Sequence, residues 1–227
     1  MKQAEINKQL TAIVKVVAKQ KGWKSVGGMP YWSIGPLFFQ LVQGAGAKEG
    51  TFYCALRFKW LELDNVLWRV LDMSGNENEP FSLHANGAFV LTGQELFSIS
   101  KRSLEWLPGV LEQQVNDAVT LGHSRSIQVA EEVGGIESYL SFIRRQHKKF
   151  MEKYPLAVVN IWKENLLAAL LVGDLSDAEK IARERILVGD NGGFSTGGKS
   201  FYECALALCA AKALSTSDKD KVKKPEI

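Results

Sequence analysis

The sequence lacks any long run of apolar residues. Its richest apolar stretch, 166–172, is much shorter than the roughly 18 residues that a membrane-spanning helix needs. The first segment, 1–21, mixes charged residues with its apolar ones, so it has no unbroken apolar core of the kind that a secretory signal peptide carries. We therefore expect a protein of the cytoplasm that has no membrane partner.

Cysteine and histidine are scarce, with three of each. The odd number of cysteines and their spacing favour buried, reduced thiols over a disulfide or a zinc site. No histidine lies three or four residues from a second histidine or a carboxylate, which excludes the common helical metal motif. The residues concerned are Cys54, Cys204, Cys209, His84, His123 and His147. We identify no catalytic, metal-binding or cofactor-binding residue, and we expect no cofactor.

A strong excess of either charge is also missing. The 28 basic and 25 acidic residues leave a formal charge of +3 over 227 residues. This total argues against a nucleic-acid partner, because nucleic-acid-binding domains usually present a dense basic face. The hydrophobic fraction of 46% and charged fraction of 23% are ordinary for a globular chain. The length suits one large domain or two small ones.

The N-terminal part predicts a helix followed by an antiparallel meander. Apolar residues recur at helical spacing over 3–20, and three segments rich in aromatic and β-branched residues follow at 23–34, 36–43 and 50–60. The third segment alternates, which predicts one buried face and one face toward solvent or a partner. The buried set is Phe52, Leu56 and Phe58, and the outward set is Tyr53, Arg57 and Lys59.

Helical signals dominate the second half. We predict a short helix or a fourth strand over 62–72, an extended segment over 81–91 and a helix capped by Thr92 with Glu95. Further helices are predicted over 109–121, 136–152 and 156–172, and from a second capping box at Ser176 and Glu179 to about residue 188. A last helix covers about 199–214, and the polar tail 215–227 is expected to be disordered.

Strands that precede helices, rather than alternate with them, indicate an α+β fold. We expect an N-terminal helix on a small antiparallel meander sheet, followed by a mostly helical C-terminal lobe. The expected divisions are 1–91 for the helix-plus-sheet lobe and 92–214 for a helical lobe of the same domain.

One segment matches a motif that binds phosphate groups in other proteins. Residues 193–200 read GFSTGGKS, which matches the letters of a phosphate-binding loop and would assign Lys199 to a phosphate and Ser200 to magnesium. Such a loop needs a strand before it and parallel strands after it, yet the preceding segment predicts a helix and only 27 residues follow Ser200. We therefore interpret the segment as a glycine-rich connection between helices.

Charge is unevenly distributed. Residues 144–153 contain the basic side chains Arg144, Arg145, Lys148, Lys149 and Lys153. Residues 61–80 are acidic, and their candidate contacts with a partner are Glu62, Asp64, Glu77 and Glu79. Both segments are interpreted first as solvated faces. The functional alternative is that the acidic segment faces a basic partner, because complementary charge speeds association.

The first 150 residues carry a recognisable order of features. An amphipathic helix is followed by the turn KGWK at 21–24, the pair Tyr31-Trp32, a strand LFFQLV at 37–42 and a strand TFYCALRF at 51–58. This order resembles a bacterial family of uncharacterised domains, members of which occur beside polymorphic and contact-dependent toxins as immunity proteins. The resemblance implies an α+β fold, no enzymatic role and neutralisation of a cognate toxin.

We therefore expect a non-enzymatic binding protein that neutralises a bacterial toxin by tight binding, with a protein partner rather than nucleic acid. Two alternatives stay open. One is an adaptor or scaffold that uses residues 109–214 as a groove for a peptide or protein. The other is a phosphate- or nucleotide-binding enzyme that uses GFSTGGKS.

Overall fold

A computed structural model describes residues 2–48, 50–102, 109–155 and 161–221, with side chains described as far as residue 213. The chain forms two compact units. The first contains residues 1–61 and 80–146, and the second contains residues 62–79 and 147–227. Helices, a five-stranded antiparallel meander sheet and a two-stranded antiparallel sheet make up the described structure, which confirms the expected α+β class.

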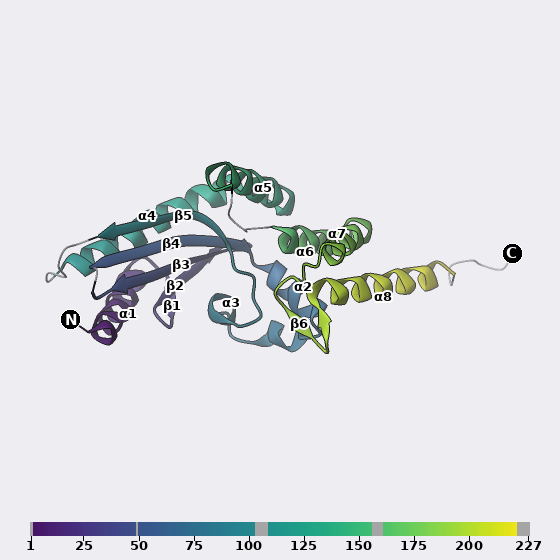
Figure 1. Cartoon of the computed structure of the whole chain (residues 1–227), viewed down its shortest axis with the longest axis horizontal. Helices are drawn as coiled ribbons and strands as arrows, with labels where there is room; N and C mark the ends of the chain where they lie inside the picture. The colour runs from purple at the N-terminus through teal and green to yellow at the C-terminus, as the bar shows by residue number, and fades with distance from the viewer. Residues whose placement is uncertain (1, 49, 103–108, 156–160, 222–227) are drawn as a thin grey trace. The chain divides into compact units, whose positions relative to one another are not determined.

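The first unit is built on a five-stranded sheet in which each strand pairs with its sequence neighbour, in the order β1-β2-β3-β4-β5 (Figure 1). The strands are β1 (Lys24–Val26), β2 (Met29–Ile34), β3 (Leu37–Gly46), β4 (Thr51–Trp60) and β5 (Gln94–Arg102). Its helices are α1 (Gln3–Gln20), α3 (Leu83–Asn86), α4 (Val110–Glu132) and the beginning of α5 (Ile136–Lys153).

Helices α1 and α4 pack on one face of the sheet. The predicted inward residues of β4, Phe52, Leu56 and Phe58, are all buried there, which confirms the alternation. Phe58 stacks on Phe39 of β3, with ring centroids 6.1 Å apart. It also meets the ring of Phe142 from α5 edge-on at 5.4 Å.

Helix α4 is longer than predicted because Gly122 serves the packing of this helix on the sheet and does not end it. The sequence placed a helix end at Gly122, but α4 continues to Glu132. A Cβ atom at Gly122 would lie 3.1 Å from a methyl group of Leu41, so the glycine lets the helix approach β3 closely. A hydrogen bond also joins α4 to the segment after α1: the Trp23 indole N–H donates to Nδ1 of His123 in α4 at 3.1 Å.

Two predictions around β5 are wrong. Residues 94–102 form a strand rather than the helix that Thr92 was expected to cap, and the segment predicted to be extended contains the short helix α3. The long pairing of β5 with β4 overrides the local capping pattern. Gly93 immediately precedes this strand and lies close to β4. A Cβ atom at this position would lie 2.7 Å from the carbonyl oxygen of Phe58, so a larger residue would not fit.

The prediction that Lys59 faces outward is also wrong, because its side chain is only 2% exposed. Its ammonium group donates to the carbonyl oxygens of His84 at 2.9 Å and Leu91 at 3.0 Å. Gln40 donates its amide to the neighbouring carbonyl of Ala85 at 2.7 Å. These bonds fasten the segment around α3 to the second face of the sheet, where it buries Lys59.

The second unit is mostly helical. It contains α2 (Glu62–Val70), η1 (Ser74–Asn78), α6 (Trp162–Val172), α7 (Leu175–Leu187), the strands β6 (Ser195–Thr196) and β7 (Lys199–Ser200), and α8 (Phe201–Lys221). Helix α7 packs on both α6 and α8, and α2 packs on the same two helices. Residues 62–72, for which helix and strand both stood open, are helical from Glu62 to Val70.

The ends of these helices differ in detail from the sequence-based expectation. Gly173 closes α6 with a φ of 83°, as its position after an apolar run suggests. The cap of α7 is Asp174, whose carboxylate accepts from the N–H of Asp177 at 3.0 Å, and not Ser176. Helix α8 continues to Lys221, so part of the tail expected to be disordered is helical, while 222–227 lie outside the described residues.

The compact units also divide the chain differently from the expected boundary at residue 91. Strand β5 and helix α4 belong with the sheet, and the helical unit takes in residues 62–79 from the N-terminal half.

Replacing Phe58 by Ala should cost about 3–5 kcal/mol of unfolding free energy, because the ring is buried and contacts aromatic rings from two directions. Tyr53→Ala on the same strand is the matched control, since Tyr53 is 39% exposed. Urea unfolding followed by circular dichroism measures both. Equal, small losses for the two variants would contradict this account of the core.

Candidate functional site

The GFSTGGKS segment forms a tight hairpin. Strands β6 and β7 pair Thr196 with Lys199, and the two turn glycines, Gly197 and Gly198, have φ values of 55° and 77°. Two successive positive φ angles are the requirement of a two-residue hairpin turn, and glycine meets it without strain. The element before this segment is helix α7, so the strand–loop–helix order of a phosphate-binding loop is not present.

The backbone N–H groups at the end of this segment, those of Ser200 and Phe201, already have hydrogen-bond partners within the chain. The N–H of Phe201 donates to the carbonyl oxygens of Asn191 and Phe194, at 3.3 and 3.0 Å. The N–H and hydroxyl of Ser200 both donate to a carboxylate oxygen of Glu203, at 2.7 Å. Ser200 and Glu203 thus form a capping box on α8 that sequence reading missed, although its spacing was visible. A carboxylate stands where a phosphate loop would present N–H groups to an anion.

The four acidic residues predicted to contact a partner do not form one exposed group. Asp64 is completely buried, which corrects its assignment as a contact. Glu77 is exposed, but it accepts from the guanidinium of Arg69, with the closer N···O distance at 2.8 Å. This bond lowers the pKa of Glu77 and offsets part of its charge. Glu62 and Glu79 remain exposed.

The cysteines follow the expectation for inert thiols. All three are free and buried, and burial raises the pKa of Cys54 to about 12. A thiol with so high a pKa is protonated at neutral pH and is a poor nucleophile. Among the described residues, no cluster of histidine, cysteine and acidic side chains is arranged to hold a metal ion.

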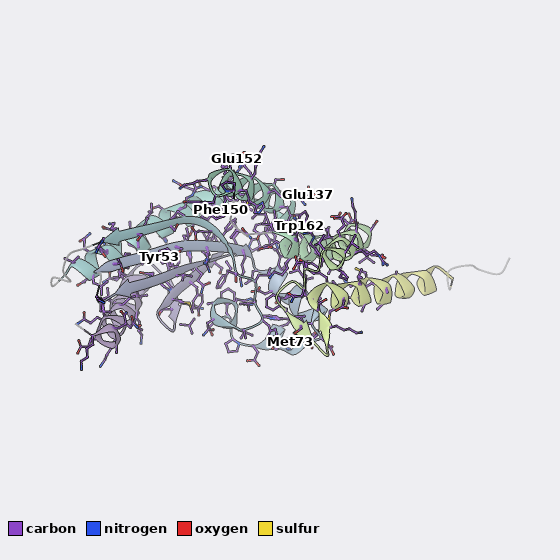
Figure 2. All side chains as sticks on the ribbon, in the orientation of Figure 1. Tyr53, Met73, Glu137, Phe150, Glu152 and Trp162 are labelled. Atoms are coloured by element: carbon purple, nitrogen blue, oxygen red, sulfur yellow. The ribbon has the colours of Figure 1, made fainter. Side chains whose placement is uncertain are left out.

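The least covered part of the second sheet face is the best candidate site, although Ala55 within it is buried and Gln40 is bonded to the α3 segment. Strand pairing sets it out as three rows, each with one residue from β3, β4 and β5. The rows are Gly44–Tyr53–Ser100, Val42–Ala55–Ser98 and Gln40–Arg57–Glu95. We call these nine residues the open face. Helices α1 and α4 lie on the other side of the sheet, and Figure 2 labels Tyr53 on the strands.

Small neighbours leave the side chain of Tyr53 projecting from the open face. Tyr53 lies between Gly44 and Ser100, and its side chain is 39% exposed. Arg57 follows on the same face and lies opposite Glu95. The sheet therefore presents an aromatic ring and, two rows along β4, a half-buried guanidinium group on the same face, with hydroxyl groups on the adjacent strand.

The electrostatics of the open face link these same residues. Partial burial raises the pKa of the Tyr53 phenol, and the charge of Glu95 raises it further while Arg57 lowers it. The phenol is therefore a neutral hydrogen-bond donor and acceptor at physiological pH. The open face offers hydrogen bonding, one cation and one anion, which suits recognition of a polypeptide surface.

Sequence reading found only part of this surface. It predicted Tyr53 and Arg57 as outward residues, but it missed Glu95, Ser98 and Ser100 because 93 onward was taken as helical. The strand signal was nevertheless present: Phe97 and Ile99 alternate with the two serines at the spacing of two that a half-buried strand shows.

Lys199→Ala should change the unfolding free energy by less than about 0.5 kcal/mol, because the side chain is exposed and lies outside any phosphate loop. Magnesium with millimolar ATP or GTP should leave the melting temperature of the parent protein unchanged. A nucleotide at 100 times its Kd would add about 2.7 kcal/mol. A rise in melting temperature that Lys199→Ala abolishes would establish a nucleotide site.

Ser200→Ala should cost about 1 kcal/mol through loss of the α8 cap. Hydrogen bonds from the Ser200 N–H and hydroxyl lower the pKa of Glu203. The ionised carboxylate therefore stabilises the fold at pH values above the pKa of Glu203 in the unfolded chain, and this stabilisation is lost as pH falls through its pKa in the folded protein. The stability difference between the parent and Glu203→Gln should therefore shrink on acidification. A difference that grows toward low pH would contradict the capping box.

No helix in the described part of the chain is both long and apolar enough to cross a membrane. No protein-family model, curated protein or solved structure matches this chain.

Proposed function

We propose that this chain is a binding protein whose partner is another protein, held against the open face of the sheet. The observation that carries the proposal is the exposed ring of Tyr53, which lies between the small residues Gly44 and Ser100 on the same sheet face as Arg57. Tyrosine and arginine are among the residues that contribute most to protein interfaces, because each combines a large contact area with polar groups.

The position of Tyr53 and Arg57 on a central strand supports this role. Both lie on β4, a strand paired on each side, so neither depends on a loop for its position. The opposite side of the same strand is fixed by the buried residues Phe52, Leu56 and Phe58. A preformed surface loses little conformational entropy on binding, and this favours tight association.

The partner that we propose is a bacterial toxin, neutralised by tight binding and without turnover of a small molecule. The resemblance of residues 1–150 to toxin-immunity domains motivates this choice. The open face lies inside that region. Association would be assisted by the exposed acidic residues of the second unit, Glu62 and Glu79, if the toxin is basic.

The adaptor alternative receives less support. It requires residues 109–214 to form one helical lobe with a groove. Helix α4, however, packs against the sheet in the first unit, while α6, α7 and α8 belong to the second. No specific feature of the described residues favours a peptide groove over the open face.

Tyr53→Ala and Arg57→Ala should each weaken binding of a toxin that this chain neutralises, sought first among the neighbouring genes, by about 2 kcal/mol, which is roughly 30-fold in Kd. Calorimetry measures Kd, and co-expression with the toxin measures protection of growth. Val16→Ala is the matched control, because Val16 is an exposed apolar residue on α1, which packs on the other sheet face. It should bind and protect like the parent.

Two results would count against the proposal. One is a neighbouring toxin that binds the parent and both open-face variants equally well. The other is failure of the parent protein to protect growth against that toxin, with no complex formed between the purified proteins.

A further inference from the structure

Helix α5 carries a dense basic stripe that the open face does not use. Five cations lie within residues 144–153, all of them exposed. We define the basic stripe as Arg144, Arg145, Lys148, Lys149 and Lys153. Glu152 is the acidic residue within these ten positions, and its label in Figure 2 marks this helix. A chain with a total charge of +3 has therefore concentrated positive charge on one helix.

The apolar face of α5 is already occupied. Tyr139, Phe142 and Ile143 are buried, and both rings contact Phe58 of the sheet, at 5.6 and 5.4 Å between centroids. Insertion of this face into a membrane or into a partner's groove would require the helix to leave the sheet. The exposed cations toward the end of α5 are what the helix leaves available to a partner.

Most of the charge on the stripe is not neutralised. Arg145 forms an ion pair with Glu132 of α4. Over the described residues, by contrast, Lys148, Lys149 and Lys153 take part in no ion pair. The ammonium group of Lys153 instead lies 5.0 Å from the ring of Tyr154, which is itself 47% exposed. Three unneutralised lysines therefore lie near the end of α5, and one of them, Lys153, contacts an accessible aromatic ring.

The average density of these cations along the helix axis is similar to that of phosphates along one strand of a nucleic acid. Residues 144 and 148, and residues 145, 149 and 153, form two rows along α5 with about 6 Å between members. Together the rows place roughly one positive charge every 3 Å along the helix axis. One strand of duplex DNA carries one phosphate per about 3.4 Å. The comparison is one of average charge density, because the five cations are unevenly spaced along the helix axis.

We infer that the basic stripe of α5 binds the phosphate backbone of a nucleic acid, with the Tyr154 ring placed to stack on a base of an unpaired strand. Cationic rows beside an exposed aromatic ring are the combination that single-strand binding surfaces use. The inference revises the expectation from net charge, because phosphate contacts depend on local charge density. It does not rest on the proposed protein partner, since the open face belongs to other elements.

The test is fluorescence anisotropy with a labelled 20-nucleotide single strand and its duplex, from 50 to 300 mM NaCl. Three proteins are compared: the parent, Lys148→Ala/Lys149→Ala/Lys153→Ala, and the matched control Lys8→Ala/Lys15→Ala/Lys19→Ala. The control removes three exposed lysines from helix α1 and has the same net charge as the test variant. Circular dichroism confirms that all three proteins are folded.

The parent should bind at 50 mM NaCl, and on the duplex its log–log salt slope should be about −3 or steeper. The stripe variant should bind at least 10-fold more weakly, with a slope shallower by about 1 for each lysine removed. The control should stay within threefold of the parent. A third variant, Tyr154→Ala, should weaken binding of the single strand more than binding of the duplex.

Several results would overturn the inference. These are no binding at 50 mM NaCl, an equal loss in the stripe and control variants, or a salt slope that the stripe variant leaves unchanged. Poly-L-glutamate or phosphatidylserine vesicles that bind the stripe more tightly than nucleic acid, at matched charge concentration, would reassign it to an acidic protein or a membrane surface. None of these results depends on the toxin experiment.

Discussion

The pairing of β3 with β4 is the constraint on which the first unit depends. All ten residues of β3, Leu37 to Gly46, are opposite a residue of β4. This register puts Phe39 beside Phe58 under the helices and Gly44 beside Tyr53 on the open face. A slip of one residue would turn every side chain to the other side of the sheet. The aromatic core and the open face are therefore two consequences of a single register, and one cannot be altered without the other.

The sequence predicted this strand pair well because its signal is local. Phe52, Leu56 and Phe58 alternate with polar residues, and the glycines between segments mark the turns. It failed where a distant contact decides the outcome. Thr92 and Glu95 satisfy a helix-capping pattern, yet pairing with β4 makes 94–102 a strand. Lys59 continues the outward alternation, but the α3 segment folds over it and accepts its hydrogen bonds. No pattern within β4 indicates which part of its face another segment will cover.

The same limit applies to short motifs. GFSTGGKS has the letters of a phosphate loop because glycine serves two purposes that a letter pattern cannot distinguish. Around a phosphate, glycine lets backbone N–H groups approach the ligand. Here Gly197 and Gly198 close a hairpin, and Gly192 avoids Phe201, which a Cβ atom would meet at 2.8 Å. The residue that decides between these roles is Glu203, three positions beyond the motif, because its carboxylate occupies the N–H of Ser200.

Charge shows how position on a helix changes the meaning of a residue. Asp64 was grouped with exposed acids by its place in the sequence, but Leu63, Leu67 and Trp68 around it are buried, so it lies on the inner side of α2. The lysines of α5 lie in the last two turns of the helix, beyond the buried residues Phe142 and Ile143, and they are exposed. A count of charges treats both segments alike, whereas the positions of neighbouring apolar residues separate them. Because the acidic segment loses one carboxylate to burial and has another paired with Arg69, while three lysines of α5 keep their charge, the basic segment has the stronger electrostatic surface of the two.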